Sequence, residues 1–98
     1  MRIQVDHHST QEAAKQKIES EATKLLEGFG SQLTRLAHSW NGDTMDISFT
    51  VFNFDLRGKI EVTSSQVIVD IELPLMARVF EGDARQAVQG KLTEFFPG

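Results

Sequence analysis

The chain of 98 residues has the length of one domain, and its 40% apolar and 24% charged residues are typical of a globular rather than a disordered protein. Its 10 basic and 14 acidic residues give a formal net charge of −4, spread evenly along the chain, which argues against a nucleic-acid-binding tail or a polybasic membrane anchor. Because cysteine is absent, disulfides, cysteine nucleophiles and thiolate metal sites are excluded.

The first residues carry no targeting signal that we can identify. Residues 1–9 lack the apolar stretch of a secretory signal, and no apolar run elsewhere approaches the length of a membrane span. We therefore expect a cytoplasmic protein without a membrane span.

The N-terminal third predicts a short strand followed by an amphipathic helix. Residues 2–5 alternate polar and apolar side chains, as a strand does. Ser9 and Glu12 have the spacing of a capping box, and apolar residues then recur at helical spacing. We predict a helix over residues 10–28, ended by Gly28 or Gly30 in a left-handed conformation.

Four strands should follow, because the apolar period changes from 3.6 to 2 after Gln32. The first places Leu36, His38 and Trp40 on one face and leads into Asn41-Gly42, which predicts a type I′ hairpin turn. The alternation continues through residues 45–51, 56–62 and 67–73, with short turns at 52–54 and 63–65. This pattern predicts an antiparallel sheet with one buried and one wet face. Candidates for cross-strand charge pairs on the wet face are Asp46, Arg57, Lys59, Asp70 and Glu72.

A second amphipathic helix is predicted at the C-terminal end, after Pro74 stops the last strand. Its apolar stripe is Phe80, Ala84, Val88, Leu92 and Phe95, and it should run to about Phe96. Two starting points are open: near Met76, or near Asp83 after an irregular segment over residues 75–80.

The element order β-α-β-β-β-β-α defines the expected fold class. We predict one α+β domain over residues 1–98, in which both helices cover one face of a curved antiparallel sheet. This two-layer sandwich is similar in shape to a reduced helix-grip fold, a likeness that implies no activity.

The residues that could carry chemistry do not form a catalytic or metal-binding pattern. Asp6-His7-His8 is tempting, but adjacent side chains on a strand point to opposite faces and cannot converge on one metal. We expect His8 to shape the approach to the helix and His38 to be a partly buried ring with a bonded nitrogen. The sequence contains no nucleophile elbow, phosphate-binding loop, dinucleotide glycine pattern or EF-hand loop. We therefore expect a protein that is not an enzyme and that has no catalytic residue, metal or cofactor.

A few apolar residues are left over once the predicted core is assigned. Phe52 and Phe54 flank a hairpin tip, where polar residues are usual, so they are candidate apolar contacts. Alternatively, one ring belongs to the core and the other covers the end of the sheet. Ile68 on the wet face suggests a partner or homodimer contact, and Trp40 is a further candidate binding residue. Of Phe95 and Phe96, one ring should be in the core and one exposed.

Several short motifs follow one another along nearly the whole chain. They are His8 shortly before Glu12-Ala13, Trp40-Asn41-Gly42-Asp43, Phe49, Gly58-Lys59-Ile60-Glu61-Val62, and Leu73-Pro74 followed by Phe80. In this order they resemble the polyhydroxyalkanoic acid system proteins, small bacterial proteins named for their gene neighbourhood in polyhydroxyalkanoate storage systems. The resemblance implies a link to polyester storage and carries no agreed catalytic residues. The sequence departs from the family at the hairpin tip, where Asn53 replaces an expected glycine but still tolerates positive φ.

Three functional hypotheses are open at this point. The first is an accessory protein that binds the polyester granule surface or a granule-associated protein, through Trp40, Phe52, Phe54 and Ile68. The second is a small carrier of an acyl or other hydrophobic ligand, which needs an apolar cavity of at least ~300 Å³. The third is a hydrolase-type enzyme acting on hydroxyacyl groups, which needs His38 to face a pocket beside carboxylates.

Overall fold

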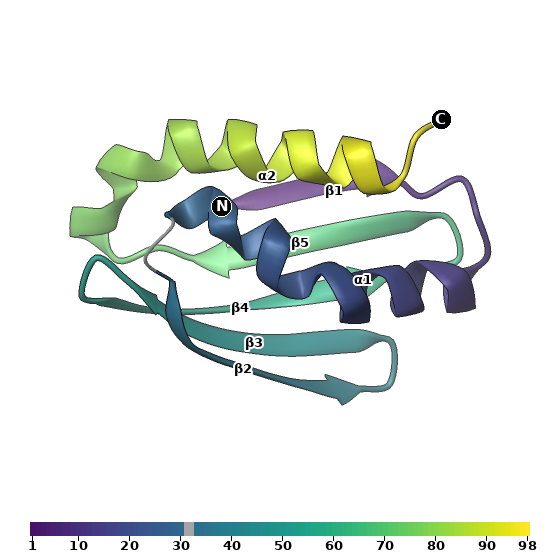
Figure 1. The fold of residues 1–98 in the computed structure, drawn as a ribbon, viewed down its shortest axis with the longest axis horizontal. Helices are drawn as coiled ribbons and strands as arrows, with labels where there is room; N and C mark the ends of the chain where they lie inside the picture. The colour runs from purple at the N-terminus through teal and green to yellow at the C-terminus, as the bar shows by residue number, and fades with distance from the viewer. Residues whose placement is uncertain (31–32) are drawn as a thin grey trace.

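The computed structural model describes residues 1–30 and 33–98 and has the predicted α+β architecture. Five antiparallel strands form one sheet in the order β1-β5-β4-β3-β2. Helices α1 and α2 lie together on one face of this sheet (Figure 1). The strands are β1 (Arg2–Asp6), β2 (Thr34–Asn41), β3 (Thr44–Val51), β4 (Phe54–Val62) and β5 (Gln66–Glu72), and the helices are α1 (Gln11–Leu26) and α2 (Glu81–Phe95). Two short 3₁₀ segments, η1 (Glu27–Phe29) and η2 (Leu75–Phe80), follow α1 and precede α2.

The core lies between the sheet and the two helices, as the alternation of apolar residues predicts. The inward side chains of β3, β4 and β5 are buried, whereas their neighbours on the other face are largely charged. Helix α1 contributes a stripe that includes Ile18 and Leu25, and α2 contributes Val88 and Leu92. One contiguous apolar cluster therefore joins both layers.

The predicted capping box at the start of α1 is wrong by one residue. The N-cap is Thr10, whose side-chain oxygen accepts a hydrogen bond from Ala13 N at 3.1 Å. The N–H of Ser9, which Glu12 would accept in a capping box, donates instead to His7 Nδ1 at 3.1 Å, and the Ser9 hydroxyl donates to Thr10 O at 3.3 Å. His8 adopts φ +54° between them, so its backbone turns the chain into the helix. The α-helix then ends at Leu26, and the chain continues as η1 up to Gly30, which has φ +143°.

The β2–β3 turn differs from the expected geometry, whereas the β3–β4 turn lies where it was expected and has positive φ at Asn53. The β2–β3 turn consists of Gly42-Asp43, since Asn41 pairs with Thr44, and only Gly42 has positive φ. This fits a turn with glycine at its first position rather than type I′. The β3–β4 turn is Phe52-Asn53, and both residues have positive φ, at +50° and +66°. The type I′ conformation therefore occurs at this turn instead of at Asn41-Gly42.

The C-terminal helix begins close to the second predicted starting point. Residues 75–80 form η2, and the α-helix starts at Glu81. Phe80 does not belong to the buried stripe, because it lies before the first α-helical turn and remains 45% exposed. At the other end Phe96 is the buried ring and Phe95 is half-buried, with Lys17 Nζ 5.6 Å from its ring centroid.

The two edges of the sheet are treated differently by the chain. Along β1, Arg85 of α2 donates a hydrogen bond to Arg2 O at 2.9 Å and so covers part of the edge. Strand β2 forms the other edge, and its register shifts between Thr34 and Ala37, where Arg35 has φ +55°.

Candidate functional site

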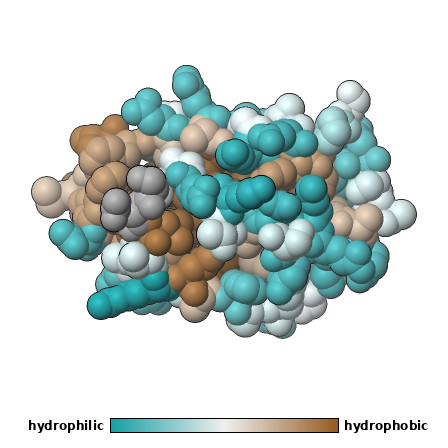
Figure 2. All heavy atoms as spheres, in the orientation of Figure 1, coloured by the Kyte–Doolittle hydropathy of each residue, from teal (hydrophilic) through white to brown (hydrophobic). Residues whose placement is uncertain are grey.

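Large apolar side chains are exposed together at one end of the molecule. They come from the β3–β4 turn and from η2, and their exposed fractions are 54% for Phe52, 79% for Leu75, 76% for Met76, 78% for Val79 and 45% for Phe80. We call these five residues the apolar end. Figure 2 shows hydrophobic surface gathered at the end of the molecule where Figure 1 places the β3–β4 turn and the segment before α2. Exposed apolar groups of this kind are typical of interaction surfaces on small proteins.

The local backbone explains why η2 turns its apolar residues outward. Pro74 ends β5 and Ala77 N donates to Pro74 O at 2.9 Å, which begins a tight 3₁₀ turn. Within η2 only Ala77 is buried, because three residues per turn bring few side chains onto the inner side. Leu75, Met76 and Val79 consequently point away from the core.

Phe52 is held in a conformation that bulky residues rarely adopt. Its φ of +50° lies in the left-handed region, which costs roughly 1–3 kcal/mol for a non-glycine residue. The ring stacks on Phe80 with a centroid distance of 5.6 Å and an interplanar angle of 23°. Gly30 allows this approach, since a Cβ there would lie 2.9 Å from the Phe52 ring. The stacking of Phe52 on Phe80 thus joins the β3–β4 turn and η2 in one surface.

The hollow beneath this aromatic pair is too small for an acyl chain. Its volume is about 20 Å³, close to the space of a single water, and its lining includes Phe29, Phe54, Leu73 and Ala77. Four larger hollows among the described residues are open to solvent and are lined mostly by charged and polar residues. The geometry therefore argues against a carrier with an internal acyl-chain site.

A polar cluster ties α1 to the edge strand β2. Trp40 Nε1 donates to Glu19 Oε2 at 2.6 Å, and His38 Nε2 bonds Glu19 Oε1 at 3.2 Å. The Trp40 hydrogen bond, followed by the His38 hydrogen bond, lowers the pKa of the Glu19 carboxyl below its ordinary value. Lys15 Nζ lies 5.1 Å from the Trp40 ring centroid and 3.2 Å from Asp43 Oδ1. His38 is exposed at this edge, so the expected partial burial of its ring is wrong, whereas the expected bonded ring nitrogen is present in the contact with Glu19 of α1.

The buried histidine is His7, which stood out in the sequence only as part of the Asp6-His7-His8 run, and not His38 as expected. It is 2% exposed, Nδ1 accepts from Ser9 N–H, and Nε2 bonds Thr63 O at 2.9 Å. These partners fit the neutral tautomer with the proton on Nε2. His7 therefore links β1 to the β4–β5 turn as part of the scaffold. Among the residues that the structure places, no three His, Asp or Glu side chains converge as a metal site would require.

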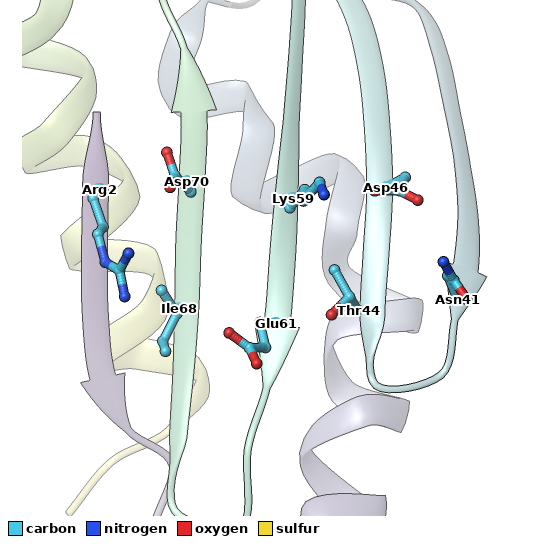
Figure 3. A pocket seen from close by; sticks show the side chains of 8 residues that line it. All are labelled: Arg2, Asn41, Thr44, Asp46, Lys59, Glu61, Ile68 and Asp70. Carbon is cyan, nitrogen blue, oxygen red and sulfur yellow. The ribbon is translucent and has the colours of Figure 1, made fainter.

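The other face of the sheet is a broad polar surface. Figure 3 shows side chains from all five strands projecting from this face, with the helices behind the sheet. Rows of opposite charges cross the strands: Asp70 lies between Arg2 and Lys59 in the register, and Asp46 follows Lys59. The expected opposition of charges is therefore present. Within residues 1–30 and 33–98, however, none of these side chains forms an ion pair shorter than 4 Å.

The four predicted binding residues lie in three different places. Phe52 and Phe54 both border the hollow at the apolar end, with Phe52 exposed and Phe54 half-buried. Trp40 belongs to the polar cluster with Glu19, and Ile68 lies on the polar sheet face. Four outward-pointing residues of η2 were not predicted as binding residues: Leu75, Met76, Val79 and Phe80. The dense apolar run over residues 75–80 was the available signal.

Fold and surface together define the class of protein: a small α+β sandwich whose notable feature is an exposed apolar end. No helix in the described part of the chain is long and apolar enough to cross a membrane. Residues 1–96 match the family model described as "Putative polyhydroxyalkanoic acid system protein", and the chain belongs to this family. The family name links the protein to the polyhydroxyalkanoate system. No curated protein and no solved structure gives a match.

Proposed function

We propose that the protein is a non-enzymatic accessory protein that adsorbs to the surface of polyester storage granules through its apolar end. The observation that carries this proposal is the cluster of large apolar side chains at one end, three of them more than three-quarters exposed. Membership of a family linked to the polyhydroxyalkanoate system supports the choice of polyester.

The shape of the apolar end favours an extended surface over a peptide or a small ligand. Its exposed side chains project from the tight turns of the chain, and the hollow among them holds only about 20 Å³. A helical peptide would need a groove, and a small ligand would need an enclosed pocket of several hundred Å³. A flat apolar surface needs neither.

The one cation within η2 fits the chemistry of a polyester. Arg78 is exposed between Met76 and Val79, and its guanidinium offers five N–H donors. A polyalkanoate surface presents methyl or alkyl groups and ester carbonyls, which are acceptors without donors. Leu75, Met76 and Val79 would pack on the alkyl groups while Arg78 donates to carbonyls, so an ester surface suits this segment better than a pure hydrocarbon.

Co-sedimentation with particles of purified polyhydroxybutyrate tests the proposal. Wild type is expected to pellet with the particles, and Leu75→Ser/Val79→Ser is expected to remain largely in the supernatant. The matched control is Gln86→Ser/Gln89→Ser, which changes two exposed residues of α2 away from the apolar end. Equal binding of wild type and Leu75→Ser/Val79→Ser would refute the proposal.

Polystyrene particles of the same size separate ester recognition from general adsorption. Wild type should bind polyester more tightly than polystyrene, and Arg78→Leu should lose that preference while keeping its affinity for polystyrene. A wild type that shows no preference would refute the role of Arg78.

A further inference from the structure

The polar face of the sheet carries charges that have no ion-pair partner within 4 Å among the residues that the structure describes. Arg2, Asp70, Lys59 and Asp46 alternate in sign across β1, β5, β4 and β3, and Glu72 lies opposite Arg57 in the adjacent row. The ion pairs shorter than 4 Å in the described ranges lie elsewhere. The same face has a shallow hollow of about 360 Å³ between these side chains.

We propose that this polar face is the interface of a symmetric dimer, and that its occupant is a second copy of the chain. The two-fold axis runs parallel to the strands, between β4 and β5, in the plane between two facing sheets. This operation places β5 of one copy over β4 of the other, and β1 over β3. Asp70 then faces the second copy's Lys59, and Glu72 faces its Arg57.

The third opposite-charge pair is Arg2 over Asp46 of the second copy, and each of the three pairs forms twice by symmetry. Facing sheets lie about 10 Å apart, a gap that Lys and Arg side chains can cross to reach an opposed carboxylate. Ile68, an apolar residue of this face, would contact the aliphatic part of Glu61 from the other copy.

Other positions of the axis give a worse match. An axis along β4 would place Lys59 over Lys59 and Asp70 over Asp46, and an axis along β5 would place Asp70 over Asp70 and Arg2 over Lys59. An axis between β3 and β4 would pair Lys59 with Asp46 but leave Arg57 opposite Ser48. Like charges in direct opposition are disfavoured in an interface, which argues against the axes along β4 and β5. The axis between β3 and β4 opposes no like charges but forms fewer opposite-charge pairs than the axis between β4 and β5.

This symmetry has a geometric consequence for surface binding. Because the axis is parallel to the strands, both copies point their β3–β4 turns in the same direction. The dimer therefore presents its two apolar ends to one surface, and the second attachment becomes intramolecular. The dimer itself does not depend on the proposed granule role, since its interface and the apolar end share no residue.

Two charge-reversed variants test the interface. The acidic variant is Arg57→Glu/Lys59→Glu, and the basic variant is Asp70→Lys/Glu72→Lys. Each alone would oppose like charges across the axis, whereas an equimolar mixture would oppose unlike charges again. The control for the acidic variant is Lys24→Glu/Lys91→Glu, which makes the same change in net charge on the helices.

Sedimentation velocity at low ionic strength, over a range of concentrations, gives the readout. Wild type and the control are expected to dimerise with an affinity that falls on adding salt. Each reversed variant should lose roughly tenfold or more in dimer affinity, and the mixture should regain a heterodimer. Circular dichroism of each variant shows whether the chain is still folded. Recovery of a heterodimer is a second control, because it requires both variant chains to be folded.

Three results would overturn the proposal. One is a wild type that stays monomeric at every concentration, and another is a dimer unaffected by either reversal. The third is a dimer lost in Leu75→Ser/Val79→Ser but retained in the reversed variants, which would place the contact at the apolar end. Failure of polyester binding with an intact salt-sensitive dimer would refute the granule role alone.

Discussion

Removing two side chains of η2 should weaken binding to polyester without weakening the fold. Leu75 and Val79 are 79% and 78% exposed in the free protein. Burial of a whole Leu or Val side chain contributes about 1.5–3 kcal/mol, so the exposed part that a surface could cover is worth about 1–2 kcal/mol for each residue. The double change to serine should therefore cost about 2–4 kcal/mol of adsorption free energy, or roughly a 30- to 700-fold fall in the partition coefficient.

The measurement is a binding isotherm on polyhydroxybutyrate particles, combined with urea unfolding of each variant in solution. Because both side chains are already in water, the free energy of unfolding should change by no more than about 0.5 kcal/mol. The reasoning is refuted if the isotherm is unchanged, because the apolar end would then not be the contact. It is also refuted if unfolding is strongly destabilised, because the residues would then support the fold rather than a surface.

Three further predictions concern the scaffold. Gly30→Ala should destabilise the fold by about 2 kcal/mol or more, since a Cβ at φ +143° would lie 2.8 Å from Val51 Cγ2; an unchanged urea midpoint would contradict this. His7→Ala should cost about 2 kcal/mol or more, because it leaves a cavity in place of a buried ring and removes the hydrogen bonds to Ser9 N and Thr63 O; calorimetry showing the wild-type melting temperature would contradict it. The lowered pKa of Glu19 means that its stabilising effect is present above the ordinary glutamate pKa and is lost as pH falls through the folded-state value. Fluorescence of Trp40, the single tryptophan, should therefore change in this acid range in wild type but not in Glu19→Gln, and identical titrations would refute the coupling.

The strands and the layers could be predicted because the spacing of apolar residues shows both the type of each element and the face that it buries. Side chains of a strand alternate between faces, so the runs over residues 45–51, 56–62 and 67–73 determine which face is buried. The helical spacing of Ile18, Leu25, Val88 and Leu92 predicts stripes that cover that face. These patterns extend over many residues, so an error at one position does not alter the result.

Turns and caps could not be predicted with the same success, because they depend on single hydrogen bonds. Asn41-Gly42 is a strong signal for type I′, but pairing of Asn41 with Thr44 moves the turn by one residue. Ser9 has the right spacing for a cap, but His7 takes its N–H, and His7 is placed there by Thr63, far away in the sequence. Local patterns contain no information about such long-range partners.

The candidate site was predicted only in part for a related reason. Phe52 stands out in the sequence because an aromatic residue at a hairpin tip is unusual. Val79 and Phe80 were hidden, because an apolar residue before a helix reads as the start of its buried stripe. The 3₁₀ geometry of η2, which turns Val79 outward and leaves Ala77 inside, is visible only in three dimensions.

The unequal edges of the sheet limit how the protein can self-associate through its backbone. Arg85 and α2 cover part of the β1 edge, and the irregular register near Arg35 shortens the regular part of β2. Strand-to-strand addition is therefore restricted to the β2 edge. Two chains joined through their β2 edges would expose only their covered β1 edges, which offer no good template for a third chain. Growth into a fibril needs a free strand edge on both sides of every added chain, so the covered β1 edge works against it.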